Sequence, residues 1–227
     1  MKVSTPLFSK KLRLPAAFTL VFGTLFLAST LPATAQTHYA GQPGGSSVKI
    51  EGTSSLHDWE MEGTLIGGFI EFGAGVQLDP TQTGIAGIQG DKVPAKSRVI
   101  IPVRGIHSKA DHMPDVMDSL MQGALKEPDF PRIQLTLKEM TFKGPHAVGK
   151  SFDFDITGDL SIAGMTNSVT FPITVECLDA DQLKVTGTVP VKMTDYGITP
   201  PAPSFGLGLM KTGPDVKIIF DWSLHKR

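Results

Sequence analysis

His57 and Asp58 are the first residues in the chain whose types could do chemistry. They stand in the stretch SSLHDW, and an imidazole beside a carboxylate is a pair that general acid–base catalysis uses. The alternative role is structural, because serine and aspartate side chains satisfy backbone donors in turns and a tryptophan packs against a core. We favour the structural role and expect His57, Asp58 and Trp59 to plug one end of the fold.

A second group of polar residues, His107, Asp111 and His112, has the composition of a three-ligand zinc site. The group falls where a strand is expected to end and a helix to begin, and exposed polar residues are common at such places. No G-x-S-x-G, H-E-x-x-H or P-loop motif occurs in a strand–helix context. We therefore predict no catalytic residue, no metal and no cofactor.

The elements that must position these residues are mostly strands. Residues 151–177 alternate apolar and polar residues in two runs separated by the turn formers Gly164–Met165–Thr166–Asn167, which predicts a long antiparallel hairpin. Similar patterns predict strands at about 48–52, 60–72, 97–106, 132–142, 183–193 and 216–224. The glycine-dotted stretch 73–96 has little periodicity, which indicates a long loop.

One helix interrupts the strands. Apolar residues recur at intervals of three and four between Asp111 and Lys126, which predicts a helix with one apolar stripe that Asp111 could cap. The stripe is rich in methionine, a side chain that adapts to irregular ligands, so the helix is either a flexible lid or a packed plug. The lid residues are Met113, Met117, Leu120 and Met121.

Eight mostly sequential strands without a repeated βα unit predict an all-β fold with one inserted helix. Twelve residues from Ser151 to Ile162 span about 40 Å at strand rise, which suits the wall of a tall barrel. The prediction is an eight-stranded antiparallel β-barrel, which is either filled by its own side chains or holds one ligand.

The N-terminal segment, residues 1–35, has the features of a secretory signal peptide. Basic residues precede an apolar run, and Ala33–Thr34–Ala35 forms an A-x-A cleavage site. An uncleaved membrane anchor is the alternative, and Pro15 and Gly23 within the run favour cleavage after Ala35. Residues 36–46 are expected to be a flexible lead-in, and residues 47–227 form the barrel domain.

Charge and cysteine content restrict the partners. Without the four basic residues of the signal peptide, 17 of the 21 lysines and arginines remain against 22 acidic residues. This acidic chain has no basic cluster, which argues against nucleic acid and anionic lipid surfaces. The single cysteine, Cys177, excludes an intrachain disulfide, and its apolar register predicts burial.

Four segments in order, over about residues 46–224, resemble the YceI-like family. SSLHDW at 54–59 is similar to the family's S-x-L-H-x-W, and GDLSIAGMT at 158–166 is similar to G-D-L-T-I-x-G-V-T. The segment from Met117 to Ile133 resembles M-x-x-x-L-K-x-x-x-x-P-x-I, and DYGI at 195–198 resembles D-F-G-I. The resemblance implies a lipocalin-like barrel, secreted to the periplasm, that binds a polyisoprenoid or quinone-like chain in its lumen and is not an enzyme.

The resulting hypothesis is a periplasmic protein that carries or sequesters a long isoprenoid lipid, polyprenyl or quinone-like, and makes transient contact with a membrane. The polar head of the bound lipid would lie near His107, Lys109 or Tyr196. Two alternatives stay open: an enzyme acting on a lipid-like or small aromatic substrate, and a filled-barrel stress protein without a ligand. The oligomeric state is also open. The expected lumen residues are Phe154, Ile156, Phe171, Ile173, Val175, Val185, Val189, Ile218, Phe220 and Trp222.

Overall fold

The computed structural model describes residues 1–2, 36–79, 81–82, 84–145, 151–202 and 211–227. The chain divides into a short unit, Met1–Ala33, and a second unit, Thr34–Arg227, which contains every strand and helix of the described residues. The predicted signal peptide lies outside the described residues except for Met1 and Lys2. No helix within the described part of the chain is long and apolar enough to cross a bilayer.

The described residues of the second unit form strands, one α-helix and two 3-10 turns. The strands are β1 (Thr37–Gly41), β2 (Ser47–Ser54), β3 (Trp59–Gly63), β4 (Gly67–Phe72), β5 (Ala95–Pro102), β6 (Ile106–Ser108), β7 (Arg132–Pro145), β8 (Ser151–Ile162), β9 (Met165–Cys177), β10 (Gln182–Lys192) and β11 (Thr212–Lys226). The helix α1 is Pro114–Ala124, and the turns are η1 (Val103–Gly105) and η2 (Met193–Tyr196).

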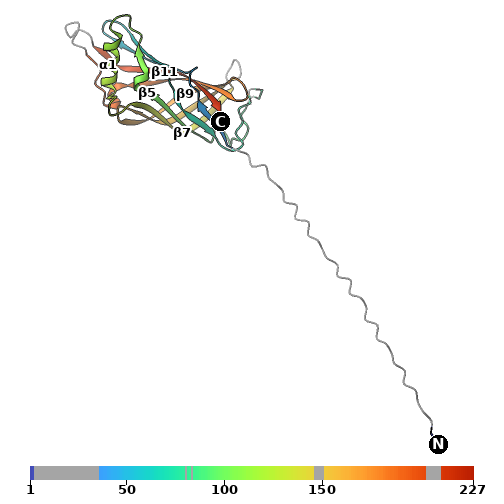
Figure 1. Cartoon of the computed structure of the whole chain (residues 1–227). Coiled ribbons are helices and arrows are strands. Elements are labelled where there is room, and N and C mark those ends of the chain that lie inside the picture. Colours follow the sequence, from blue (N-terminus) through green and yellow to red (C-terminus); the bar gives the residue numbers. More distant parts are fainter. Residues whose placement is uncertain (3–35, 80, 83, 146–150, 203–210) are drawn as a thin grey trace. The chain divides into compact units, whose positions relative to one another are not determined.

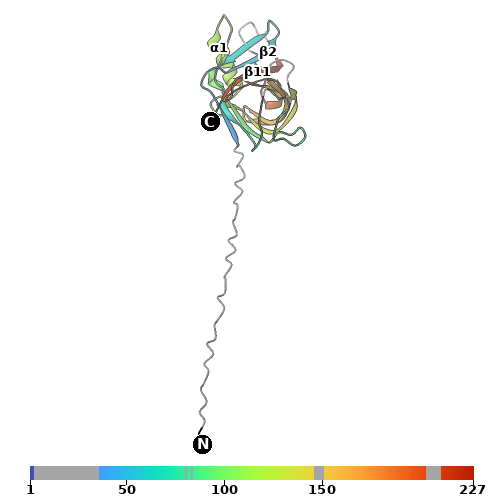
Figure 2. The ribbon, with the colours of Figure 1, turned by 90° about the vertical axis from the view of Figure 1, so that its right-hand side faces the viewer.

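These strands form a closed antiparallel barrel. Eight of them follow one another in the order β1, β4, β5, β7, β8, β9, β10 and β11, and β11 pairs back to β1. The end of β11 pairs with β1, and the earlier part of the same edge, from Thr212 to Asp221, pairs with β2. The sheet continues from β2 to β3 and β6. Figure 2 shows the resulting ring of strands. The predicted eight-stranded, lipocalin-like antiparallel barrel with one helix is confirmed.

The hairpin of β8 and β9 has the alternation that the sequence predicted. Every second residue of β8 is buried from Phe152 to Ile162, because one face of the strand meets the barrel interior. The register closes at Ile162 and Met165, so only Ala163 and Gly164 form the turn. Both have positive φ, 49° and 86°, the backbone of a tight type I′ hairpin turn.

The two ends of the barrel differ. At the helix end, β2, β8 and β10 finish and β3, β7 and β11 begin, and α1 lies there (Figure 1). At the loop end, the loop from Gly73 to Pro94 contributes buried side chains of Val76, Ile85 and Val93 to the core. The strand-terminal residues Phe72 and Phe152 are also buried there. These loop side chains therefore cover the end of the barrel that lies away from α1. The sequence analysis assigned no role to this loop.

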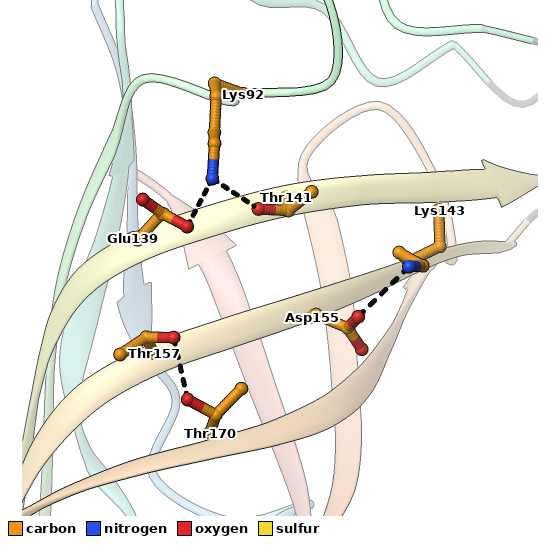
Figure 3. Close-up of polar contacts among 7 residues, drawn as sticks. All are labelled: Lys92, Glu139, Thr141, Lys143, Asp155, Thr157 and Thr170. Atoms are coloured by element: carbon orange, nitrogen blue, oxygen red, sulfur yellow. Dashed lines mark hydrogen bonds and ion pairs between the residues drawn. The ribbon is translucent and has the colours of Figure 1, made fainter.

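Polar contacts on the outer face attach this loop to the barrel wall (Figure 3). The amide of Val93 donates to the Met140 carbonyl at 2.9 Å, and the Lys92 ammonium contacts Glu139 and donates to Thr141 Oγ1. On the neighbouring strands, Lys143 pairs with Asp155 and Thr157 bonds to Thr170. Such cross-strand pairs hold adjacent strands in register.

Three details of the sequence analysis are corrected. The flexible lead-in is wrong for Thr37–Gly41, which forms β1 because it pairs with β4 on one edge and β11 on the other. The single strand 60–72 is interrupted between Gly63 and Gly67, and its parts β3 and β4 have different partners. The helix begins at Pro114, not Asp111, because Met113 adopts a left-handed φ of 54° immediately before it and no side chain caps it.

Candidate functional site

A cavity of about 110 Å³ lies at the helix end of the barrel. Its walls come from the ends of β2, β8 and β10, from the starts of β3, β7 and β11, and from α1 and η2. Apart from Ser54, His57 and Thr212, the side chains that line it are apolar, and none carries a fixed charge. The site can therefore solvate hydrocarbon but offers no ionic partner for a ligand.

The helix α1 forms one side of this cavity. Met117, Leu120, Met121 and Ala124 line it, and they share a face because they are spaced by three and four residues. No residue of α1 is fully buried, so the helix covers the cavity without entering the core. Met113 is exposed and does not line the cavity.

Two acidic side chains tie the helix segment to the strand segment beside it. The Asp118 carboxylate accepts a hydrogen bond from the Ser108 amide at 2.6 Å and contacts His107 Nδ1 at 2.7 Å. Just after the helix, the buried Glu127 carboxylate takes a two-atom contact with Arg104, whose Nε lies 2.7 Å from Oε1. We call these four side chains and the Ser108 amide the helix latch.

Trp59 forms part of the cavity wall. Its indole lies over Gly52, where an added Cβ would come within 2.2 Å of the ring, and its Nε1 donates to the Thr53 carbonyl at 3.1 Å. Only a glycine at position 52 permits this approach. Trp59 and His57 both border the cavity.

The His57–Asp58 pair does not assemble as an acid–base dyad. His57 Nδ1 contacts the backbone oxygen of Asp58 at 2.7 Å, whereas the Asp58 side chain is exposed. Ser54 organises the turn, because its Oγ donates to the His57 carbonyl and accepts from the amides of Leu56 and His57. The stretch SSLHDW thus shapes a turn at the cavity.

The second polar group is also dispersed. His107 is engaged by Asp118 in the helix latch, and Asp111 and His112 are exposed. Within the described ranges, no three or more histidine, cysteine, aspartate or glutamate side chains are placed to hold a metal ion.

The predicted head-group residues lie in three different settings. Lys109 pairs with Glu62 at 2.6 Å, which raises the pKa of the ammonium and lowers the pKa of the carboxyl. Tyr196 is buried in η2, and burial raises the pKa of its hydroxyl. His107 belongs to the latch. The structure does not bring these three side chains together at the cavity.

The predicted lumen residues face the barrel interior but occupy a different level. Nine of the ten are buried, and Phe220 is half-buried. Only Ile218 borders the cavity. The sequence analysis did not select thirteen other residues that line the cavity. The strands contribute Ile50, Ser54, Met61, Ile133, Ile162, Val191, Thr212 and Val216, and the helix end and η2 segments contribute Ala124, Leu125, Met193, Ile198 and Pro201. The alternation of apolar and polar residues within each strand could have identified the strand residues as inward-facing. It could not show that the cavity lies at the helix end of the barrel.

A family model of the YceI-like domain matches residues 39–224. The chain belongs to the YceI-like family. The family match confirms the resemblance on which the sequence analysis relied. The YceI-like family is a family of binding proteins. A search of curated protein sequences finds no match.

Solved structures show the same fold as this YceI-like domain. BcnA from Burkholderia cenocepacia has a TM-score of 0.53 and 16% identity, with 78% of this chain and 95% of BcnA covered. A polyisoprenoid-binding domain from Saccharophagus degradans, implicated in plant cell wall breakdown, has a TM-score of 0.57 and 14% identity, with 83% and 98% covered. These two likenesses show that the described barrel has the fold of both neighbours.

Proposed function

We propose that this YceI-like domain binds an isoprenoid lipid, polyprenyl or quinone-like, by burying part of its apolar chain in the cavity at the helix end. The protein would carry or sequester that lipid without any covalent step. One observation carries the proposal: apolar side chains from six strands line the cavity, and α1 covers it. The helix contributes Met117, Leu120, Met121 and Ala124 to the lining.

The energetics fit a ligand that is recognised by burial. Each methylene transferred from water into an apolar site contributes about 0.8 kcal/mol. An isoprenoid chain therefore binds strongly without an ionic contact, and none of the lining side chains would provide one. Methionine side chains at Met117 and Met121 adapt to a branched chain at little cost, because their thioether chains are unbranched and flexible.

The proposal places the protein in the periplasm. Its support is the sequence of residues 1–35, with a basic start, an apolar run and an A-x-A site. Fractionation of the host cell and N-terminal sequencing of the protein test this directly. A mature chain beginning at Gln36 in the periplasmic fraction is expected, and an intact N-terminus in the cytoplasm would refute it.

Native mass spectrometry of the protein purified from its own host tests the binding function. We expect a bound hydrophobe of several hundred daltons that organic solvent extracts. Ala124→Leu adds a side chain inside the cavity and should lower the bound fraction. Ser119→Leu adds the same side chain on the exposed side of α1 and serves as the matched control. Wild-type protein that is consistently empty and takes up no added isoprenoid would reject the proposal and favour the filled-barrel alternative.

A further inference from the structure

We infer that an apolar ligand enters and leaves the barrel sideways, through a seam in its wall between β9 and β10, and not by displacement of α1. The seam consists of the facing edges of residues 165–172 on β9 and residues 188–192 on β10. The inference rests on the proposed function and adds the route by which a lipid reaches the cavity. Such a route lets the lipid exchange while the helix latch stays closed.

The seam begins where the pairing of the two strands stops. The strands β9 and β10 pair from Cys177 and Leu183 to Ile173 and Gly187, and no further pair joins them among the described residues. Beyond that point β9 pairs with β8 alone, and β10 pairs with β11 alone. Over this stretch each strand therefore has one edge without a ladder of backbone hydrogen bonds.

Two prolines lie on these edges. Pro172 pairs with Asp155 on β8, and Pro190 pairs with Lys217 on β11, so both are paired on the side away from the seam. Proline has no amide hydrogen, and within a sheet it occurs where its nitrogen faces no partner strand. The missing donors therefore face the seam, where they hinder β9 and β10 from pairing further.

A side-chain hydrogen bond closes the seam at the helix end. Asn167 Nδ2 donates to the Asp195 carbonyl at 2.8 Å, which ties β9 to η2 just after the end of β10. Both groups are neutral, whereas the helix latch uses the charged carboxylates of Asp118 and Glu127. Hydrogen bonds to charged groups are the stronger ones, so the seam should open at a lower cost than α1 lifts.

Apolar side chains close the seam between its two ends. On the inward face, Phe171 of β9 and Val189 and Val191 of β10 are buried, and Val169 of β9 is half-buried. Apolar contacts are non-directional. These side chains can therefore separate and re-form around a hydrocarbon chain without leaving a backbone hydrogen bond broken.

The seam connects the outer surface with the cavity. A groove of about 780 Å³ lies at the last strand pair and is lined by Pro172 and Thr188. Phe220, which has the inward register of β11, borders the same groove and is half-buried, so the wall is thin at this point. At the other end of the seam, Val191 of β10 and Met193 of η2 line the cavity.

Exchange kinetics with farnesol test this route, because a passage controls rates and not affinity. Association and dissociation are followed by stopped-flow tryptophan fluorescence, since Trp59 borders the cavity. Asn167→Ala removes the tie across the seam, so both rate constants should rise about threefold to tenfold at an unchanged Kd. Thr170→Ala is the matched control. It removes a hydrogen bond to Thr157 on β8, on the side of β9 away from the seam, and should exchange farnesol at the wild-type rates.

A covalent tie across the seam should have the opposite effect. Asn167→Cys combined with Asp195→Cys is joined by a bis-maleimide whose linker contains a reducible disulfide, while Cys177 is buried and protected from the reagent. Both rate constants should fall by at least about tenfold. Reduction of the linker should return them to the values of Asn167→Ala.

Two results would overturn the inference while leaving the proposed function intact. One is farnesol exchange at the wild-type rates in both Asn167→Ala and the cross-linked protein, which would place the entry elsewhere, for example beneath α1. The other is a change in Kd that accounts for the whole change in the dissociation rate, which would make Asn167 part of the binding site. Wild-type protein that binds no farnesol would instead refute the proposed function together with the inference.

Discussion

Replacing Asp118 with alanine should release α1 from the barrel. The Asp118 side chain is only 16% exposed, and it accepts hydrogen bonds from the Ser108 amide and from His107. A hydrogen bond to a charged group contributes about 1.5–3 kcal/mol. Two such bonds, discounted for partial exposure and for the second anchor at Glu127, contribute about 2–4 kcal/mol.

Amide hydrogen exchange in α1 measures this contribution where it acts. A loss of about 3 kcal/mol in the free energy of helix opening speeds exchange more than about a hundredfold. The exchange of β8 amides, in the centre of the wall, should change far less. Retention of bound lipid should fall in parallel, because α1 supplies four of the side chains that line the cavity.

Two further variants make this prediction specific. Asp118→Asn keeps an acceptor for the Ser108 amide and should show a smaller effect. Asp115→Ala removes an exposed carboxylate from the first turn of the same helix, where its interaction with the helix dipole contributes about 0.3–1 kcal/mol. Equal exchange rates in α1 for the wild type and Asp118→Ala would show that the latch does not hold the helix.

Three other perturbations test separate parts of the structure. Gly52→Ala should cost about 1–3 kcal/mol and shift the Trp59 fluorescence, because the new Cβ displaces the indole; an unaltered melting temperature and spectrum would contradict this packing. The Lys109 ammonium lowers the pKa of Glu62, so the pair stabilises the fold above about pH 4.3 and loses its effect as pH falls through the lowered pKa. Lys109→Met should raise the Glu62 pKa in an NMR titration, and no change would disprove the pairing. Burial raises the pKa of Tyr39, so the unfolded chain ionises first and stability falls as pH rises above about 10; Tyr39→Phe should flatten that decline, and an equally steep one would count against the assignment.

Period-two alternation was sufficient to predict most of the fold. It identified β8, β9, β10 and β11 and their inward faces, because each of these strands carries five or more inward positions. It missed β1, whose only strongly apolar inward residue is Tyr39. This strand exists because two neighbouring strands bind its edges, and no local pattern reports such pairing.

The site was harder to predict than the fold. Alternation shows which face of a strand is inward, but it does not show which level along the barrel is packed and which is open. Ile218 and Phe220 have the same inward register on β11, yet Ile218 borders the cavity at the helix end and Phe220 does not. The ring of Phe220 lies against Gly187 and Phe171, neighbours that only the folded barrel supplies.

The contacts of the helix latch also could not be predicted from the sequence. The sequence analysis grouped His107 with Asp111 and His112 because the three are close in the chain. In the structure, the partner of His107 is Asp118 in α1. Asp118 reaches His107 and the Ser108 amide because α1 packs beside β6. Spacing along the chain does not report such a contact between two elements.

Methyl NMR of the protein during titration with farnesol tests the central claim most directly. Shifts are expected at methyl groups of the cavity, such as Ile50, Met121, Ile162 and Ile218, with little change at Val175 and Leu224 near the loop end. Ala124→Leu should weaken all of the cavity shifts together. Shifts confined to the loop end, or spread evenly through the lumen, would contradict binding in the cavity at the helix end.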